Sequence, residues 1–159
     1  MAPLEAALAL VEGAPRRILD LGTGTGAGAS WLAERFPDAS VAGVDISPEM
    51  VERARQNLPA ELGARVEFAT ADAASLPFGD GEFDLISQVS VPAFFADTAR
   101  VLAPGGFLVV VSSLGSATPA HTPPRLLRRG FEAEGMEWVG DGAAGRGTFY
   151  VMRKPQRQP

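Results

Sequence analysis

Residues 18–26 read ILDLGTGTG, and this stretch decides the fold. The apolar residues at its start predict a short buried strand over 16–22, which includes the two preceding arginines and ends at the first glycine. Trp31, Leu32 and Phe36 follow at helical spacing and predict a helix over 26–36. Glycines allow the loop between these elements to turn tightly and to approach a ligand. The start of the helix adds unpaired N–H groups and a positive dipole end, so the loop is a candidate binding site.

Outward from this stretch, short apolar runs alternate with segments of helical period, which is typical of a parallel sheet covered by helices. Ser47 and Pro48 predict a helix start, because serine caps a helix and proline suits its first position. The pattern predicts strands over 16–22, 40–46, 65–71, 83–89 and 107–112, helices from 48, over 92–102 and over 124–134, and a turn at 104–106. Closing strands are expected over 136–140 and 148–153, around a loop at 141–147. The fold class is therefore α/β.

The composition fits a single globular domain over residues 1–159. A net charge of −5 argues against a nucleic-acid partner, and 46% apolar residues are enough for one core. Cysteine is absent, and no apolar run approaches the roughly 20 residues of a membrane span. Without the basic start of a signal peptide, we expect a cytoplasmic protein with no membrane contact. Within the domain we expect a short N-terminal helix in 1–15, a substrate-side loop at 113–124 and a frayed tail at 155–159.

The glycine loop by itself allows more than one function. Gly22, Gly24 and Ala27 satisfy the dinucleotide-binding fingerprint, which would indicate a nicotinamide oxidoreductase. Asp45 ends the second strand, and an acid there suits paired ribose hydroxyls in either kind of site. A tight turn without any ligand is the structural alternative. However, Asp20, the glycines and Asp45 fall at strand ends on one edge of the sheet, where open α/β sheets bind ligands.

Four further stretches distinguish between these interpretations: VDISPEM (44–50), ATADAASLPFGDGEFDLIS (69–87), ARVLAPGGFLVV (99–110) and FYVMRKP (149–155). Together with ILDLGTGTG they resemble the class I S-adenosylmethionine-dependent methyltransferases, in the family's order and over nearly the whole chain. The resemblance implies a Rossmann-like, doubly wound, mostly parallel seven-stranded sheet with an antiparallel last strand and helices on both faces. It also implies S-adenosylmethionine as the cofactor.

The resemblance implies that one group of residues holds the methionine end of the cofactor. The glycine loop would lie under the methionine part, and Asp20 would hold its ammonium group. Ser87 and Gln88, at the end of the fourth strand, would face the same end and the transferred methyl. The loop residues implied are Gly22, Thr23, Gly24 and Gly26.

A second group is implied for the nucleoside end. Asp45 would accept hydrogen bonds from both ribose hydroxyls, and Ile46 would pack on the adenine. Asp72 would accept a hydrogen bond from the adenine amino group, and the backbone N–H of Ala73 would donate to the ring. Each acid also has a structural alternative, as a turn residue, a residue before a capped helix or an ordinary strand-end acid.

The chemistry of the cofactor agrees with these residue types. S-adenosylmethionine carries an ammonium, a carboxylate and a sulfonium but no phosphate, so carboxylates and backbone N–H groups suit it. No basic residue lies in 18–34, so nothing in the loop calls for the 2′-phosphate of a dinucleotide.

Methyl transfer depends mainly on holding the acceptor in line with the methyl group. A base is needed only where the acceptor must lose a proton. His121 is the only histidine and the candidate catalytic base, with an ordinary surface histidine as the alternative. A lone histidine and no cysteine predict no metal site.

Two departures from the family pattern bear on function. Only about 15 residues precede the first strand, so the helices that cover the pocket in many small-molecule methyltransferases are reduced to one helix at most. The stretch after the fourth strand also lacks the histidines that many relatives carry. The expected activity is methyl transfer to a small molecule, with the 113–124 loop, a homodimer or a partner subunit completing the site. A non-catalytic cofactor-binding subunit and a methyltransferase-like fold used for another reaction are the alternatives.

Overall fold

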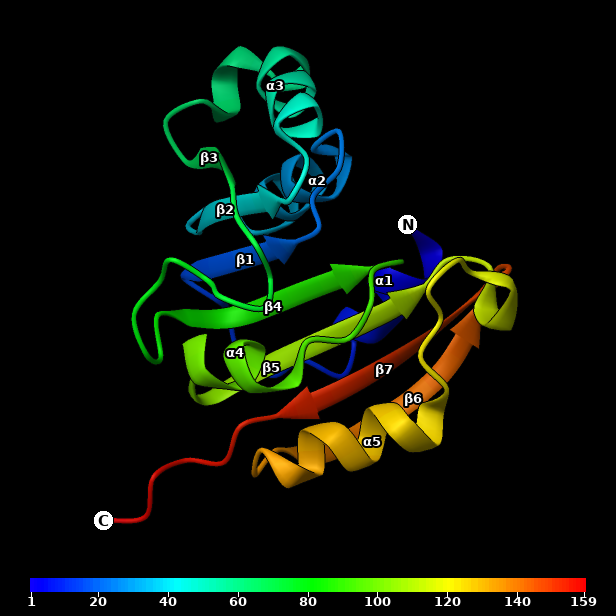
Figure 1. Cartoon of the computed structure of the whole chain (residues 1–159). Helices are drawn as coiled ribbons and strands as arrows, with labels where there is room; N and C mark the ends of the chain where they lie inside the picture. Colours follow the sequence, from blue (N-terminus) through cyan, green and yellow to red (C-terminus); the bar gives the residue numbers. More distant parts are fainter.

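The computed structural model describes all 159 residues, with five α-helices around one seven-stranded sheet (Figure 1). The strands are β1 Arg17–Leu21, β2 Ser40–Asp45, β3 Val66–Thr70, β4 Phe83–Val89, β5 Leu102–Ser112, β6 Glu137–Ala144 and β7 Gly147–Arg153. The helices are α1 Ala2–Leu8, α2 Ala27–Arg35, α3 Pro48–Asn57, α4 Phe95–Val101 and α5 Pro124–Ala133, with short 3-10 helices at η1 Ala60–Leu62 and η2 Gly115–Ala117. None of these helices combines the length and the apolarity of a membrane span.

The strands lie in the order β3-β2-β1-β4-β5-β7-β6. Pairing is parallel from β3 through to β5, whereas β7 runs antiparallel to both β5 and β6. The chain winds outward from β1 to β3 and then returns to β4 on the other side of β1. The direction of winding therefore reverses between β1 and β4, which makes their carboxyl ends the expected binding edge. This topology confirms the predicted doubly wound α/β sheet with antiparallel pairing at its end.

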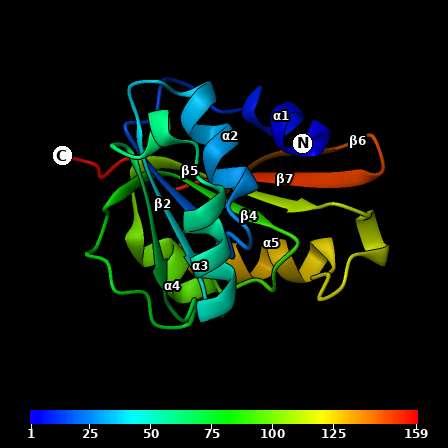
Figure 2. The same ribbon diagram turned by 90° about the horizontal axis from the view of Figure 1, so that it is seen from above.

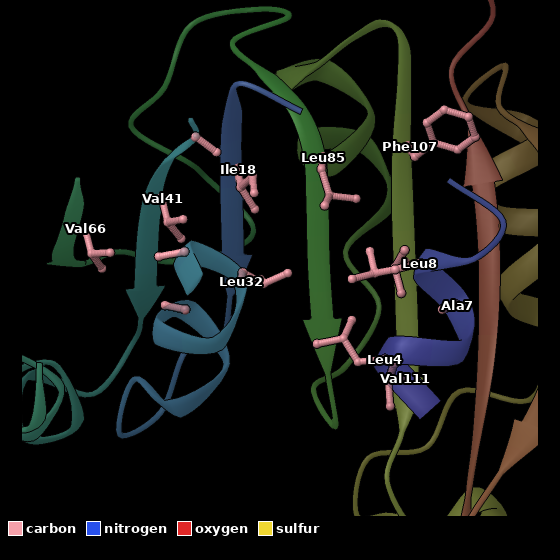
Figure 3. Packing of buried hydrophobic residues seen from close by; sticks show 14 of the residues in the cluster. Leu4, Ala7, Leu8, Ile18, Leu32, Val41, Val66, Leu85, Phe107 and Val111 are labelled. Atoms are coloured by element: carbon pink, nitrogen blue, oxygen red, sulfur yellow. The ribbon is translucent and has the colours of Figure 1, made fainter. Parts of the chain in front are cut away.

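Helices cover both faces of the sheet, and each face has its own core because side chains alternate along a strand. Figure 2 shows α1 and α2 on one side of the sheet and α4 and α5 on the other. The α1–α3 face buries a cluster with Leu4, Leu32 and Leu85 near its middle (Figure 3). The α4–α5 face buries a second cluster that contains Ile86 of β4 and Phe131 of α5. Neighbouring residues of β4 thus belong to different cores.

The predicted helix start after the second strand is confirmed. The hydroxyl of Ser47 accepts a hydrogen bond from the backbone N–H of Met50 at 3.3 Å, and Pro48 is the first residue of α3. This cap turns the chain sharply just after Asp45, so the carboxyl end of β2 stays open at the edge of the sheet.

The closing hairpin differs from the prediction. The loop expected at 141–147 is strand as far as Ala144, and only a tight turn joins β6 to β7. The glycines of this segment indicated a loop, but Gly140 and Gly142 have close neighbours in the folded chain. A Cβ on Gly142 would come within 2.7 Å of the Phe149 ring, and one on Gly140 within 3.0 Å of Leu10. Glycine is needed there for close approach, not for a turn.

Two boundaries around the fourth and fifth strands also differ. The helix predicted over 92–102 begins only at Phe95, because Pro92 and the two residues after it carry the chain across the carboxyl edge of the sheet. The turn predicted at 104–106 lies inside β5, which begins at Leu102 and is irregular where Gly105 adopts a φ of 80°.

Candidate functional site

A cavity of about 210 Å³ opens at the carboxyl ends of β1 and β2, next to the point where the winding reverses. One wall comes from the ends of β1 and β2, the second from the segment after β3, and the third from the segment between β4 and α4. Seven of the eleven lining residues are hydrophobic. The lining is Leu21, Gly22, Val44, Asp45, Ile46, Ala71, Asp72, Ala73, Val91, Pro92 and Phe94.

The glycine loop bends directly beneath this cavity. Gly22, Gly24 and Gly26 all adopt positive φ values, of 74°, 54° and 85°, which side-chain-bearing residues rarely adopt. The N–H groups of Gly22 and Thr23 both donate to the carbonyl of Val44, which ties the loop to the end of β2. A Cβ on Gly22 would overlap the side chain of Val91, whereas a Cβ on Gly24 would meet nothing within 4 Å. The loop is therefore packed at its first glycine and open at its second.

This contrast predicts different effects for two alanine substitutions. Gly22→Ala combines an unfavourable φ with overlap against Val91, and we expect it to destabilise the protein by about 2–4 kcal/mol. Gly24→Ala, the matched control, meets only the strained φ and should cost about 1 kcal/mol. Thermal unfolding of the two variants measures the difference. Equal melting temperatures would contradict the packing of Val91 on the loop.

Asp20 lies below the loop as a buried acid, with 3% of its surface exposed. Its carboxylate accepts a hydrogen bond from the Thr23 hydroxyl at 2.7 Å, and no arginine or lysine forms an ion pair with it. Burial raises the pKa of Asp20 to about 6, and the nearby charge of Asp45 adds to that rise, while the hydrogen bond from Thr23 opposes it. The site thus holds a carboxyl that lacks a cationic partner.

Ser87 lies beside Asp20 in the sheet, because the two residues are register partners on β1 and β4. Ile18 and Leu85 lie two residues before this pair on the same strands and are buried on the α1–α3 face. Because every second side chain of a strand faces the same side, Asp20 and Ser87 also point to the α1–α3 face. The Ser87 hydroxyl is buried beside the Asp20 carboxylate and helps to lower the pKa of that acid, although no hydrogen bond of good geometry joins the two groups. A buried polar atom without a partner is costly, so this hydroxyl is available to a ligand.

Asp45 occupies the end of β2 and joins the glycine loop to the start of α3. One carboxylate oxygen accepts from the N–H of Gly24 at 2.9 Å, and the other accepts from the N–H of Ser47 at 3.0 Å. A carboxylate has about four acceptor positions, so each oxygen can still accept one further hydrogen bond. Asp45 therefore faces the cavity as a fixed pair of acceptors.

The other three residues expected at the nucleoside end also line the cavity, Ile46 just after β2 and Asp72 and Ala73 after β3. Ile46 is 70% exposed, which is unusual for a large apolar side chain and leaves a free surface beside the cavity. Asp72 accepts a hydrogen bond from the N–H of Ala74 at 2.9 Å, and this contact holds the turn in which Ala73 lies.

Gln88 and His121 do not face Asp20 and Ser87. The Gln88 side chain is buried on the α4–α5 face, where its amide donates to the hydroxyl of Thr98 at 3.1 Å. It therefore points away from Asp20 and Ser87, contrary to the expectation that Ser87 and Gln88 face the same end. His121 lies in the loop after β5, and its Nδ1 is 3.2 Å from the Ser112 hydroxyl. No other ionisable side chain forms a hydrogen bond with this imidazole.

Three residues of the cavity wall were not predicted from the sequence. Val91, Pro92 and Phe94 close the cavity over the glycine loop. Phe94 falls within the helix predicted over 92–102, but it precedes α4 in an extended conformation, with a φ of −120°. The dipeptide Val91-Pro92 could have predicted an extended segment here, because proline restricts the residue before it to extended backbone.

The residues present fit S-adenosylmethionine. The unpaired carboxylate of Asp20 and the unpartnered hydroxyl of Ser87 suit an ammonium group. The open oxygens of Asp45 suit a pair of hydroxyls, and the exposed side chain of Ile46 suits an aromatic ring. Metal binding has no such support, since no group of three or more His, Asp or Glu side chains is placed to hold an ion.

Comparison with known proteins gives the same family. Residues 18–106 match the family described as "Methyltransferase domain". A demethylmenaquinone methyltransferase of Thermus thermophilus is 48% identical over 108 residues, which are 64% of this chain and 49% of the relative. A trans-aconitate 2-methyltransferase of Methylobacterium radiotolerans is 42% identical over 122 residues, or 72% of this chain and 44% of the relative. The chain thus spans less than half the length of these relatives.

A solved structure shows the same fold over the full chain. An S-adenosylmethionine-dependent methyltransferase from Methanosarcina mazei superposes with a TM-score of 0.76 and 21% identity, covering 99% of both chains. The match of the family pattern spans the strands and loops that build the cavity, from β1 through α4. This chain therefore belongs to the class I S-adenosylmethionine-dependent methyltransferase family.

Proposed function

We propose that this protein transfers the methyl group of S-adenosylmethionine to a small-molecule acceptor. The observation that carries the proposal is the unpaired, buried carboxyl of Asp20 next to a cavity whose rim holds Asp45 and Asp72. These acids are spaced along one edge of the sheet, as the ammonium, ribose and adenine of one extended cofactor require.

When bound, the cofactor supplies a methyl group on an already activated sulfonium. The chain therefore has to bind, orient and exclude water rather than activate a leaving group. Asp20 and Ser87 hold the charged end, the glycine loop lies under it, and Asp45 fixes the ribose. Val91 and Phe94 cover the loop and limit the access of water. The Thr23 hydroxyl is a positioning group, because it holds the Asp20 carboxylate in place.

The acceptor atom is a separate question from the cofactor site. The two relatives are named for acceptors of different chemistry, a quinone precursor and a tricarboxylic acid. An acceptor that must lose a proton requires a base, and His121, held by Ser112, is the candidate for that role. An acceptor that is already an anion requires none.

Isothermal titration calorimetry with S-adenosylhomocysteine and with NAD tests the cofactor class. We expect binding of S-adenosylhomocysteine and none of NAD, because no cationic side chain lines the cavity to meet a pyrophosphate. The opposite preference would overturn the proposal. Turnover of a panel of small acceptors with labelled S-adenosylmethionine then tests transfer. Cofactor binding without transfer to any acceptor would assign the chain to the non-catalytic alternative.

A further inference from the structure

A second cavity, of about 270 Å³, opens at the same carboxyl edge but on the α1–α3 face. Its walls are the start of α1, the ends of β4 and β5, and the tight turn between β6 and β7. Pro3, Leu4, Val89 and Val111 give it an apolar interior. Ser113, the first residue of the loop expected on the substrate side, also lines it.

This cavity lies next to the methionine end of the proposed cofactor site. Ser87 and Val89 share one face of β4, and two residues along a strand span about 7 Å. Val91, two residues further on, lines the first cavity. The segment from Val89 to Val91 thus forms the partition between the two cavities. Its middle residue, Ser90, has a φ of 54°, a conformation that is uncommon for a residue with a side chain and that is concentrated at functional sites.

Two polar features break the apolar lining. The first is a hydroxyl pair, because the oxygens of Ser90 and Ser113 are 2.7 Å apart, and Ser90 also accepts from the Ser113 backbone N–H at 3.2 Å. Of the two hydroxyl protons, only one lies in the bond that joins them, so the other is free to donate to a ligand. The pair lies at the partition, where the two cavities approach each other.

The second feature is Arg146, in the turn between β6 and β7. It is the one charged side chain among the residues that line this cavity, and it is exposed and forms no ion pair or side-chain hydrogen bond. The turn is held close to the end of β5, because a Cβ on the neighbouring Gly147 would meet the carbonyl of Ser113 at 3.0 Å. A guanidinium in this position favours an anionic ligand group.

No residue that lines this cavity is a histidine, an aspartate or a glutamate. The cavity therefore offers no carboxylate or imidazole side chain to remove a proton from an acceptor. A carboxylate acceptor needs none, because a carboxyl group is already ionised near neutral pH. The lining thus combines an apolar interior, the guanidinium of Arg146 and a spare hydroxyl donor, without an acidic or imidazole side chain.

We propose that this second cavity binds the methyl acceptor, and that the acceptor is an amphipathic carboxylate. The inference rests on the proposed function. The apolar chain of the acid packs against Leu4, Val89 and Val111, while its carboxylate meets Arg146 and the hydroxyl pair. One carboxylate oxygen forms a bond to the methyl carbon as the carbon–sulfur bond breaks, and the electron pair of that bond stays on sulfur. The products are a methyl ester and a neutral thioether, and no proton is released.

The test measures binding of octanoate and of octanol, its neutral analogue, to protein saturated with S-adenosylhomocysteine. We expect Arg146→Gln to weaken octanoate binding at least about tenfold and to leave octanol binding unchanged. Val89→Phe fills the interior and should abolish binding of both ligands. Arg129→Gln, a matched control for the loss of one exposed arginine on α5, should change neither. Methyl octanoate formation, followed by mass spectrometry, should fall in parallel with octanoate binding.

The outcomes separate this inference from the proposed function. Failure of the wild-type protein to bind S-adenosylhomocysteine overturns the proposed function and the inference with it. If S-adenosylhomocysteine binds with equal affinity to the wild type, Arg146→Gln and Val89→Phe, the cofactor site is intact in each. In that case, equal octanoate affinity in all three proteins overturns the second cavity as the acceptor site.

Discussion

Replacing Asp45 with alanine should weaken the binding of S-adenosylhomocysteine by at least about 100-fold. The carboxylate offers two free acceptor positions to the ribose hydroxyls, and a hydrogen bond to a charged group contributes about 1.5–3 kcal/mol. Loss of two such bonds therefore exceeds the roughly 2.8 kcal/mol that corresponds to a 100-fold change. Calorimetry of the purified variant against the wild-type protein measures the effect.

The same substitution also removes a structural contact, because Asp45 accepts hydrogen bonds from the N–H groups of Gly24 and Ser47. A ligand that lacks one ribose hydroxyl separates the two effects. The wild-type protein should bind 2′-deoxy-S-adenosylhomocysteine more weakly than the parent compound, whereas Asp45→Ala should bind both equally. If the variant still distinguishes the two ligands as the wild type does, the ribose is bound elsewhere.

The loop and the helix start that frame the proposed cofactor site could be predicted from the sequence, because their conformational requirements are local. Gly22 needs a positive φ within a strand-to-helix turn, and the Ser47-Pro48 pair fixes a helix start just after Asp45. These requirements are satisfied by residues close together in the chain, so a short motif is enough to predict them. The parallel sheet covered by helices follows from the alternation of short strands and helices, whereas its doubly wound order was implied by the family resemblance.

The second cavity, which we propose as the acceptor site, could not be predicted because it is built from distant segments. The second cavity brings the start of α1 against Val89, Ser113 and Arg146, and no motif records which of these segments meet. Gly142 gave a misleading signal, since a glycine required beside the Phe149 ring is indistinguishable in sequence from a glycine in a loop. The opposite orientation of Ser87 and Gln88 could have been predicted from the sequence, because consecutive residues of a strand face opposite sides of the sheet.

Asp20 should make cofactor binding depend on pH. In the free protein burial raises the pKa of its carboxyl to about 6, and a bound ammonium group lowers it again by stabilising the carboxylate. Below pH 6 the carboxyl must lose its proton before this ion pair can form. Affinity for S-adenosylhomocysteine should therefore rise about tenfold between pH 5 and pH 7 and then level off. Asp20→Asn should bind more weakly and show no such rise, whereas Asp38→Asn, an exposed control, should keep the wild-type slope.

The raised pKa has an opposite consequence for the stability of the free protein. A carboxyl whose pKa is higher in the folded than in the unfolded state contributes stability below about pH 4, and this contribution is lost as the pH rises through 6. A shift from 3.8 to about 6 corresponds to roughly 3 kcal/mol, so Asp20→Asn should be more stable than the wild type at pH 7.5 but not at pH 4. Urea unfolding at the two pH values measures this difference. If Asp20→Asn is more stable than the wild type at pH 7.5 and binds S-adenosylhomocysteine more weakly, Asp20 serves cofactor binding and destabilises the fold. If the variant and the wild type are equally stable at both pH values, the carboxylate does not destabilise the fold.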